Sequence, residues 1–151
     1  MAALLAAALT IGDDASAQES YWNLTVAEGE SLTLADGEFT VEDNVEVFGE
    51  LVLDNCSFDM TNEFSAAESE IRIQPGGSLT VRDCSLTSTA NLTSNATATF
   101  RVVLDDGELL LNRVNMTSGR LWLVGGNATL FDTRLDGEIS FLENSTGLFI
   151  H

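Results

Sequence analysis

The chain has no lysine, one proline and one histidine, and these scarcities exclude several kinds of protein. All six basic residues are arginine, whereas 24 residues are acidic, so the formal net charge is −18 over 151 residues. A surplus of this sign excludes a protein that binds nucleic acid by electrostatic attraction. The hydrophobic content of 44% excludes a disordered acidic tail, because such tails lack the apolar residues that form a core.

Catalytic and metal-binding side chains are also scarce. The single histidine is the final residue, His151, which leaves no histidine for a Ser–His–Asp triad. Cys56 and Cys84 are the only cysteines, too few with one histidine for a zinc site. Asp13-Asp14 and Asp105-Asp106 offer oxygen ligands for Ca²⁺, although surface solvation accounts for most of the carboxylates. We therefore assign no catalytic, cofactor-binding or metal-binding residue from the sequence.

The apolar N-terminus predicts export. Residues 1–11 are apolar and rich in alanine, and Ala15 and Ala17 occupy positions −3 and −1 before Gln18. This arrangement predicts a secretory signal peptide over residues 1–17 and a mature domain over residues 18–151. Because no positive residue precedes the run, an apolar N-terminal cap on the core stays open as the alternative. No other segment approaches the roughly 18 unbroken apolar residues of a transmembrane helix.

Seven of the ten asparagines lie in Asn-x-Ser/Thr sequences, the acceptor pattern for N-linked glycans. Serine and threonine occupy 28 of the 151 positions, so chance alone gives only about two such sequences. The excess predicts an extracellular or cell-surface glycoprotein, although Asn, Ser and Thr also gather in β turns without glycosylation. The surplus of acids, with arginine as the only cation, resembles the composition of halophilic proteins. The candidate sites are Asn23, Asn55, Asn91, Asn95, Asn115, Asn127 and Asn144.

An imperfect repeat is the most informative feature of the chain. Four segments each begin with glycine, followed by two alternating apolar residues, a two-residue turn and a further small or apolar pair. They are residues 49–58, 77–86, 107–116 and 126–135. A strand of period two places Leu51 and Leu53 on one face but Cys56 and Phe58 on the other. Burying all four requires a bend at Asp54-Asn55, and its recurrence predicts a coiled solenoid rather than a hairpin.

A further short apolar strand precedes each glycine, so each coil is predicted to hold three strands. These strands are residues 45–47, 71–73, 102–104, 121–123 and 139–141. Their spacing falls from 26 and 31 residues to 19 and 18, and the difference lies in polar links at 59–70 and 87–99. Stacked repeats tolerate insertions at one corner, so we expect an all-β solenoid of about four to five coils.

This repeat, over about residues 30–150, resembles the right-handed parallel β-helix of the pectate-lyase-like superfamily. The resemblance lies in the repeat pattern and includes no catalytic motif. It implies three parallel sheets, inward ladders of like side chains and a tight corner that often holds asparagine. Asn55 and Asp83 occupy this corner, whereas Arg113 departs from it. A left-handed β-helix and an antiparallel sandwich stay open as alternatives.

Cys56 and Cys84 take the same slot in neighbouring coils. Stacked strands lie about 4.8 Å apart, within the range of Cα separations found in disulfides. A bond would close a loop of 28 residues and add about 3 kcal/mol of stability. A reduced, buried cysteine ladder is the alternative, because in-register side chains run parallel and hold their β-carbons slightly too far apart.

Trp122 is predicted to point outward between the inward Leu121 and Leu123, in one column with Arg72 and Val103. An exposed aromatic ring on a flat sheet can stack on a sugar, so Trp122 is a candidate for carbohydrate contact. A ring covered by a neighbouring loop or by another subunit is the alternative.

Residues 146–150 predict one more strand just before the chain stops, and hence an uncapped last coil. Such an end is expected of a chain truncated at its C-terminus, and it invites end-to-end self-association.

These features predict a secreted or cell-surface protein with a structural or adhesive role in an envelope or extracellular matrix. Its partners would be carbohydrate or other surface proteins. The alternative is a fragment or degenerate copy of a polysaccharide lyase or glycoside hydrolase of the same fold, because fold alone does not decide function. The resemblance implies that such lyases hold Ca²⁺ with acidic residues and use a basic residue as proton acceptor. A cleft lined by two or three acids and an arginine would favour the enzyme.

Overall fold

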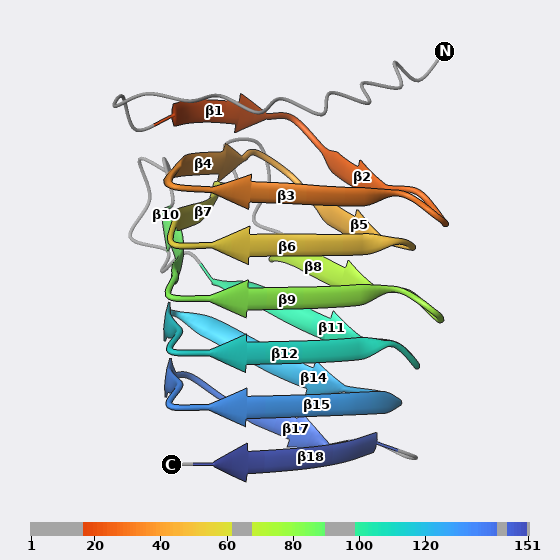
Figure 1. Cartoon of the computed structure of the whole chain (residues 1–151). Coiled ribbons are helices and arrows are strands. Elements are labelled where there is room, and N and C mark those ends of the chain that lie inside the picture. The colour runs from red at the N-terminus through yellow and green to blue at the C-terminus, as the bar shows by residue number, and fades with distance from the viewer. Residues whose placement is uncertain (1–16, 62–67, 90–98, 142–144, 151) are drawn as a thin grey trace.

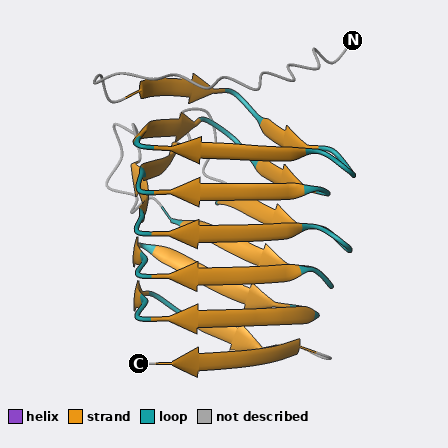
Figure 2. Ribbon diagram, viewed as in Figure 1, coloured by secondary structure: helices purple, strands orange, loops and turns teal. Residues whose placement is uncertain are grey.

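The computed structural model describes residues 17–61, 68–89, 99–141 and 145–150. The chain winds as a right-handed parallel β-helix of six coils, each of which gives one strand to each of three parallel sheets (Figure 1). Figure 2 shows that strands make up nearly all of this ribbon and that short loops join them. The part of the chain described contains no helix that could cross a bilayer. The architecture predicted from the repeat is confirmed.

Each sheet takes every third strand of the chain. Sheet A contains β1 (Ala17–Tyr21), β4 (Gly37–Val41), β7 (Ser57–Thr61), β10 (Ser85–Thr89), β13 (Asn115–Thr117) and β16 (Arg134–Asp136). Sheet B contains β2 (Leu24–Val26), β5 (Val45–Val47), β8 (Ser69–Ile73), β11 (Phe100–Leu104), β14 (Gly119–Leu123) and β17 (Ile139–Phe141). Sheet C contains β3 (Ser31–Ala35), β6 (Glu50–Asp54), β9 (Ser78–Arg82), β12 (Glu108–Asn112), β15 (Gly126–Phe131) and β18 (Ser145–Ile150).

The repeat begins one coil earlier than the sequence suggested, with β1, β2 and β3. In this first coil Glu30 stands in the slot that Gly49 and Gly77 fill in later coils, which hid the match. The register nevertheless places Leu32 and Leu34 directly on Leu51 and Leu53 of the next coil. Six coils therefore stand where about four to five were expected.

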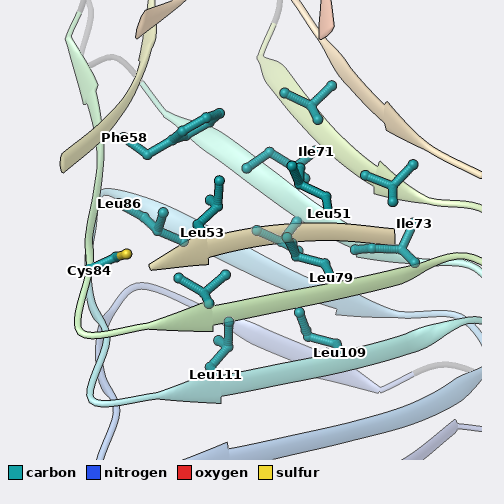
Figure 3. Close-up of a cluster of buried hydrophobic side chains, with 14 of the residues drawn as sticks. Leu51, Leu53, Phe58, Ile71, Ile73, Leu79, Cys84, Leu86, Leu109 and Leu111 are labelled. Atoms are coloured by element: carbon teal, nitrogen blue, oxygen red, sulfur yellow. The ribbon is translucent and has the colours of Figure 1, made fainter. Parts of the chain in front are cut away.

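The core is a set of apolar ladders that run along the axis of the helix. Leu51, Leu79 and Leu109 are register partners in sheet C, and each is at most 2% exposed (Figure 3). Leu53 and Leu111 form part of a parallel ladder two residues further along the strands. Because successive residues of a strand face opposite sides of the sheet, every second residue points into the interior and is apolar. The residues between them face outward, where polar side chains stand.

The corner between sheets C and A explains how residues an odd number of places apart along the chain can both be buried. Leu53 and Phe58 are both fully buried, and Asn55 between them has a left-handed backbone with φ of 48°. The equivalent residues of the other coils share this conformation, with φ between 45° and 56°: Asp36, Asp83, Arg113 and Asp132. The predicted bend is confirmed, and Asp holds three of these five positions and Asn one, in keeping with the tolerance of both residues for this region.

Arg113 is the one corner residue of these five that is neither Asn nor Asp, and its side chain forms an ion pair with Asp83. Its guanidinium donates two hydrogen bonds of 2.5 Å to the carboxylate of Asp83 in the coil above. The same guanidinium holds the pKa of the Asp83 carboxyl below its usual value, mainly through this hydrogen bond. In the first two coils, the Asn55 amide likewise donates to Asp36 at 2.7 Å, so polar side chains bridge successive corners.

The last coil exposes part of its inward face. Leu135 and Ile139 are only partly buried, and Phe141, the register partner of the fully buried Leu123, is 50% exposed. The predicted strand at 146–150 forms as β18, which pairs with β15. End-to-end association through this end stays a prediction.

Candidate functional site

The outer face of sheet B gathers three of the six arginines in three successive coils. Arg72 lies on β8, Arg101 on β11 and Arg120 on β14, each beside inward residues of its strand. The register stacks Arg101 between Glu70 and Arg120, so one outward column carries an acid followed by two arginines along the axis. In a chain with a net charge of −18, this face carries half of the arginines.

Glu70 is held on both of its carboxylate oxygens. Arg72 Nε donates to Oε1 at 2.5 Å, and Arg101 Nε donates to Oε2 at 2.9 Å. The backbone N–H of Glu70 donates to Asn44 Oδ1 at 3.0 Å in the coil above. The side chain is only 14% exposed, so these contacts replace most of the water that the carboxylate would otherwise bind.

Glu68 lies beside Glu70 with weaker contacts. Arg101 Nη1 is 3.8 Å from its Oε2 and Arg120 Nη1 is 3.6 Å from its Oε1. These distances are those of ion pairs rather than hydrogen bonds, and the buried Oε1 has no hydrogen-bond partner. Glu68 therefore keeps unused capacity to accept a hydrogen bond.

A small open hollow of about 210 Å³ lies next to these side chains. It is lined by Asn44, Val45, Glu46, Glu68, Glu70, Arg72 and Arg101. The lining is almost wholly polar, and the volume is below the roughly 300 Å³ at which pockets for drug-sized ligands begin. The hollow thus suits a single small polar group with both donor and acceptor atoms.

Trp122 lies on this same face, as the alternation predicted. Leu121 and Leu123 on either side are fully buried, and the register places Trp122 beside Val103, with Arg72 next in the column. The Arg101 guanidinium carbon is 4.6 Å from the centroid of the indole ring. The ring is therefore partly covered by an arginine of its own sheet, through a cation–π contact.

The four predicted glycosylation sites within the described residues all have exposed asparagines. They are Asn23, Asn55, Asn115 and Asn127; Asn91, Asn95 and Asn144 lie outside the described residues. In each of the four, the middle residue of the sequence is buried: Leu24, Cys56, Met116 and Ala128. The asparagine and the Ser or Thr two places further on therefore both lie on the outer side of the coil. The four sites border all three sheets.

Cys56 and Cys84 meet at the corner between sheets C and A, as the repeat predicted. Both are buried, and their sulfurs lie 3.1 Å apart. They are free thiols in this structure. The Cys56 backbone N–H also donates to Cys84 Sγ, at 3.3 Å.

The acidic pairs proposed for Ca²⁺ find no support as a cluster. Asp105 lies 3.6 Å from Arg72 Nη1, and Asp106 is exposed on a turn with φ of 56°. Asp13-Asp14 and His151 lie outside the described residues. Over the residues that the structure describes, no three His, Cys, Asp or Glu side chains come together as metal ligands would.

The sequence did not single out the cluster of Glu68, Glu70, Arg101 and Arg120. Its signal was nevertheless present, since residues 70, 101 and 120 each stand one place before an inward residue of the predicted sheet B strands. Aligning the coils on that place would have shown one acid and two arginines in a single outward column.

Comparisons of the chain with protein-family models, with curated proteins and with solved structures found no match.

Proposed function

We propose that this chain is a secreted or cell-surface β-helix protein, glycosylated on its outer faces, with a structural or adhesive role in an envelope or extracellular matrix. The observation that carries the proposal is the exposure of all four described acceptor asparagines around the three sheets. An acceptor must face outward to carry a glycan without disturbing the core, and these four do so.

The first coil is compatible with export. Cleavage before Gln18 would remove a single residue, Ala17, from β1 and leave the other four register pairs between β1 and β4 intact. The high negative charge would keep such a protein soluble in a salty medium, where screening shortens the range of self-repulsion to below about 10 Å. The stacked ladders then supply a rigid rod whose outer faces meet partners.

Sheet B is the face we assign to adhesion. From β8 to β14 its described outward positions hold no glycosylation sequence, and they carry the arginines, the two carboxylates and Trp122. A polar hollow with an adjacent indole ring fits a carbohydrate or a polar surface of another extracellular protein.

The test is the intact mass of the protein secreted from a host that glycosylates asparagine. We expect a chain that begins at Gln18 and carries added sugar mass, which enzymatic deglycosylation removes. Asn115→Gln and Asn127→Gln should each remove the mass of one glycan, because both asparagines are exposed on strands. Asn112→Gln is the matched control, because Asn112 is not followed by Ser or Thr two places on. An unmodified chain that begins at Met1 would contradict both export and glycosylation.

A second candidate is an enzyme that cleaves polysaccharide, and the hollow on sheet B favours it. Three acids and two arginines line this hollow. Glycoside hydrolysis needs one carboxylic acid and one carboxylate about 5–10 Å apart. Both oxygens of Glu70 are already bound by Arg72 and Arg101, which leaves Glu46 and Glu68 as the acids of the hollow that could act. The exposed acceptor asparagines support the scaffold directly, whereas no second observation singles out a catalytic pair, and we therefore rank this function second.

The scaffold proposal therefore expects no cleavage when the purified protein is incubated with a panel of neutral and acidic polysaccharides. Reducing ends and ultraviolet-absorbing unsaturated products would be measured together, since hydrolases give the former and lyases also the latter. Cleavage that Glu68→Gln abolishes and Glu38→Gln preserves would establish the enzyme instead. Glu38 is the control because it is an exposed glutamate on β4 of sheet A, outside the lining of the hollow.

A further inference from the structure

The chain holds Cys56 and Cys84 directly opposite one another in adjacent coils. Cys56 precedes β7 and Cys84 precedes β10, and the register pairs Ser57 with Ser85. Backbone hydrogen bonds lie on both sides of the pair: Ser85 N donates to Cys56 O at 3.0 Å, and Asn55 N donates to Arg82 O at 2.9 Å. The separation of the two backbones is therefore fixed at that of neighbouring strands, about 4.8 Å.

The two sulfurs are already in close contact. Their separation of 3.1 Å is shorter than the roughly 3.5–4.0 Å at which non-bonded heavy atoms pack best. A disulfide needs about 2.05 Å between sulfurs and 4.4–6.8 Å between α-carbons, so the sulfurs need move by only about 1 Å. We propose that Cys56 and Cys84 form an intramolecular disulfide that joins the second and third coils. The proposal favours the bond over the reduced cysteine ladder, which the sequence left open as the alternative.

Neither cysteine has another cysteine of the chain with which to form a disulfide, because the sequence contains only these two. Both residues are buried, and Figure 3 shows the Cys84 sulfur beside Leu86. The same slot holds Gly37 in the coil above and Val114 in the coil below. A bond between two molecules would require the corner to open, whereas the intramolecular bond needs no movement of the coil.

The two sulfurs share a hydrogen bond in which either can be the donor. This contact lowers the pKa of Cys84 and raises the pKa of Cys56, and burial raises both. Once the forming corner has brought the sulfurs together, the exchange starts at Cys84, because the thiolate is the reactive form. Its thiolate attacks one sulfur of a disulfide oxidant such as oxidised glutathione and expels one glutathione thiolate, which takes up a proton.

The second step closes the bond. Cys56 loses its proton to solvent, its sulfur attacks Cys84 Sγ, and the second glutathione leaves as a thiolate. The two cysteines together give up two electrons and two protons, and one glutathione disulfide becomes two thiols. Because both cysteines are buried in the finished coil, the oxidant must reach them while the corner forms.

The experiment is refolding of the reduced, unfolded chain in a buffer of reduced and oxidised glutathione, followed by alkylation of free thiols, trypsin digestion and mass spectrometry. Trypsin cleaves here only after arginine, and Arg72 and Arg82 separate the two cysteines. We expect one cross-linked species, made of the peptide that ends at Arg72 and the peptide of residues 83–101, lighter by two hydrogens. The oxidised chain should melt about 10 °C above the reduced chain, because the bond closes a loop of 28 residues.

Three variants complete the test. Cys56→Ser and Cys84→Ser should each lack the cross-linked peptide, and the double variant should melt close to the reduced wild type. Two alkylated cysteines after refolding of the wild type, or a cross-link only between molecules, would overturn the proposal. An oxidised chain that melts below the reduced one would also overturn it, since the coil would then have to distort to admit the bond. The experiment needs neither export nor glycosylation, so its outcome is separate from the proposed function.

Discussion

Replacing Gly77 by alanine is expected to lower the free energy of unfolding by more than about 4 kcal/mol, enough to prevent folding of many domains. Gly77 leads the third strand of its coil at the corner between sheets B and C. A β-carbon built there would lie 2.2 Å from the carbonyl oxygen of Val47 and 3.1 Å from that of Gln74. Both are backbone atoms, so the clash is relieved only if neighbouring coils move apart.

The adjacent glycine provides a matched control. Gly76 has φ of 80°, and a β-carbon added there meets no atom within 4 Å. Gly76→Ala should therefore cost only the left-handed backbone penalty of about 1–2 kcal/mol. Urea unfolding of both variants, followed by circular dichroism, measures the difference. Equal losses at the two positions would show that backbone conformation, rather than the approach of the coils, explains the repeated glycine.

The glycine that leads each repeat could be found in the sequence, but the reason for its recurrence could not. Gly49, Gly77, Gly107 and Gly126 marked the repeat correctly. The reason for their recurrence is the distance to the previous coil: a β-carbon on Gly49 or Gly126 would meet a backbone oxygen at 2.3 or 2.2 Å. Such a contact joins residues about 20 positions apart and follows only from the stacking itself.

The sequence predicted best which residues of each strand face inward and where the chain must bend. The odd spacing between Leu53 and Cys56 allowed only a bend if both were buried, and both are. The alternation of inward and outward residues depends only on the strand itself, so it can be read without knowing how the coils stack. The first coil escaped detection because Glu30 stands where the later coils have their leading glycine, although its stacking residues are in register.

The candidate site was harder to predict because its chemistry arises between coils. Trp122 was placed correctly on the outer face, since that needs only its own strand. The partner that covers it, Arg101, comes from the previous coil, 21 residues earlier. Glu68 and Glu70 likewise meet Arg101 across coils, and one of the two long links lies between residues 70 and 101. Charge pairs of this kind become visible only after the register is known.

Phe58→Ala is expected to destabilise the fold by about 3–5 kcal/mol, the usual cost of emptying a fully buried aromatic site. Phe58 is wholly buried in sheet A, where the register stacks it between Phe39 of the second coil's first strand and Leu86 of the next. Removing the ring opens a cavity in the middle of a ladder, and neighbouring residues cannot fill it because backbone hydrogen bonds fix the spacing of the coils.

Phe131→Ala is the control, because Phe131 is 42% exposed at the end of β15 and its truncation should change the free energy of unfolding by less than about 0.5 kcal/mol. The two variants are compared in urea by fluorescence and by circular dichroism. In a stack of repeats each coil is stabilised by its neighbours, so a cavity between coils weakens the coupling of the two halves. We therefore expect Phe58→Ala to lower the slope of the unfolding transition as well as its midpoint. A lower midpoint with an unchanged slope would instead mean that the six coils unfold as one unit even after the central ladder is broken.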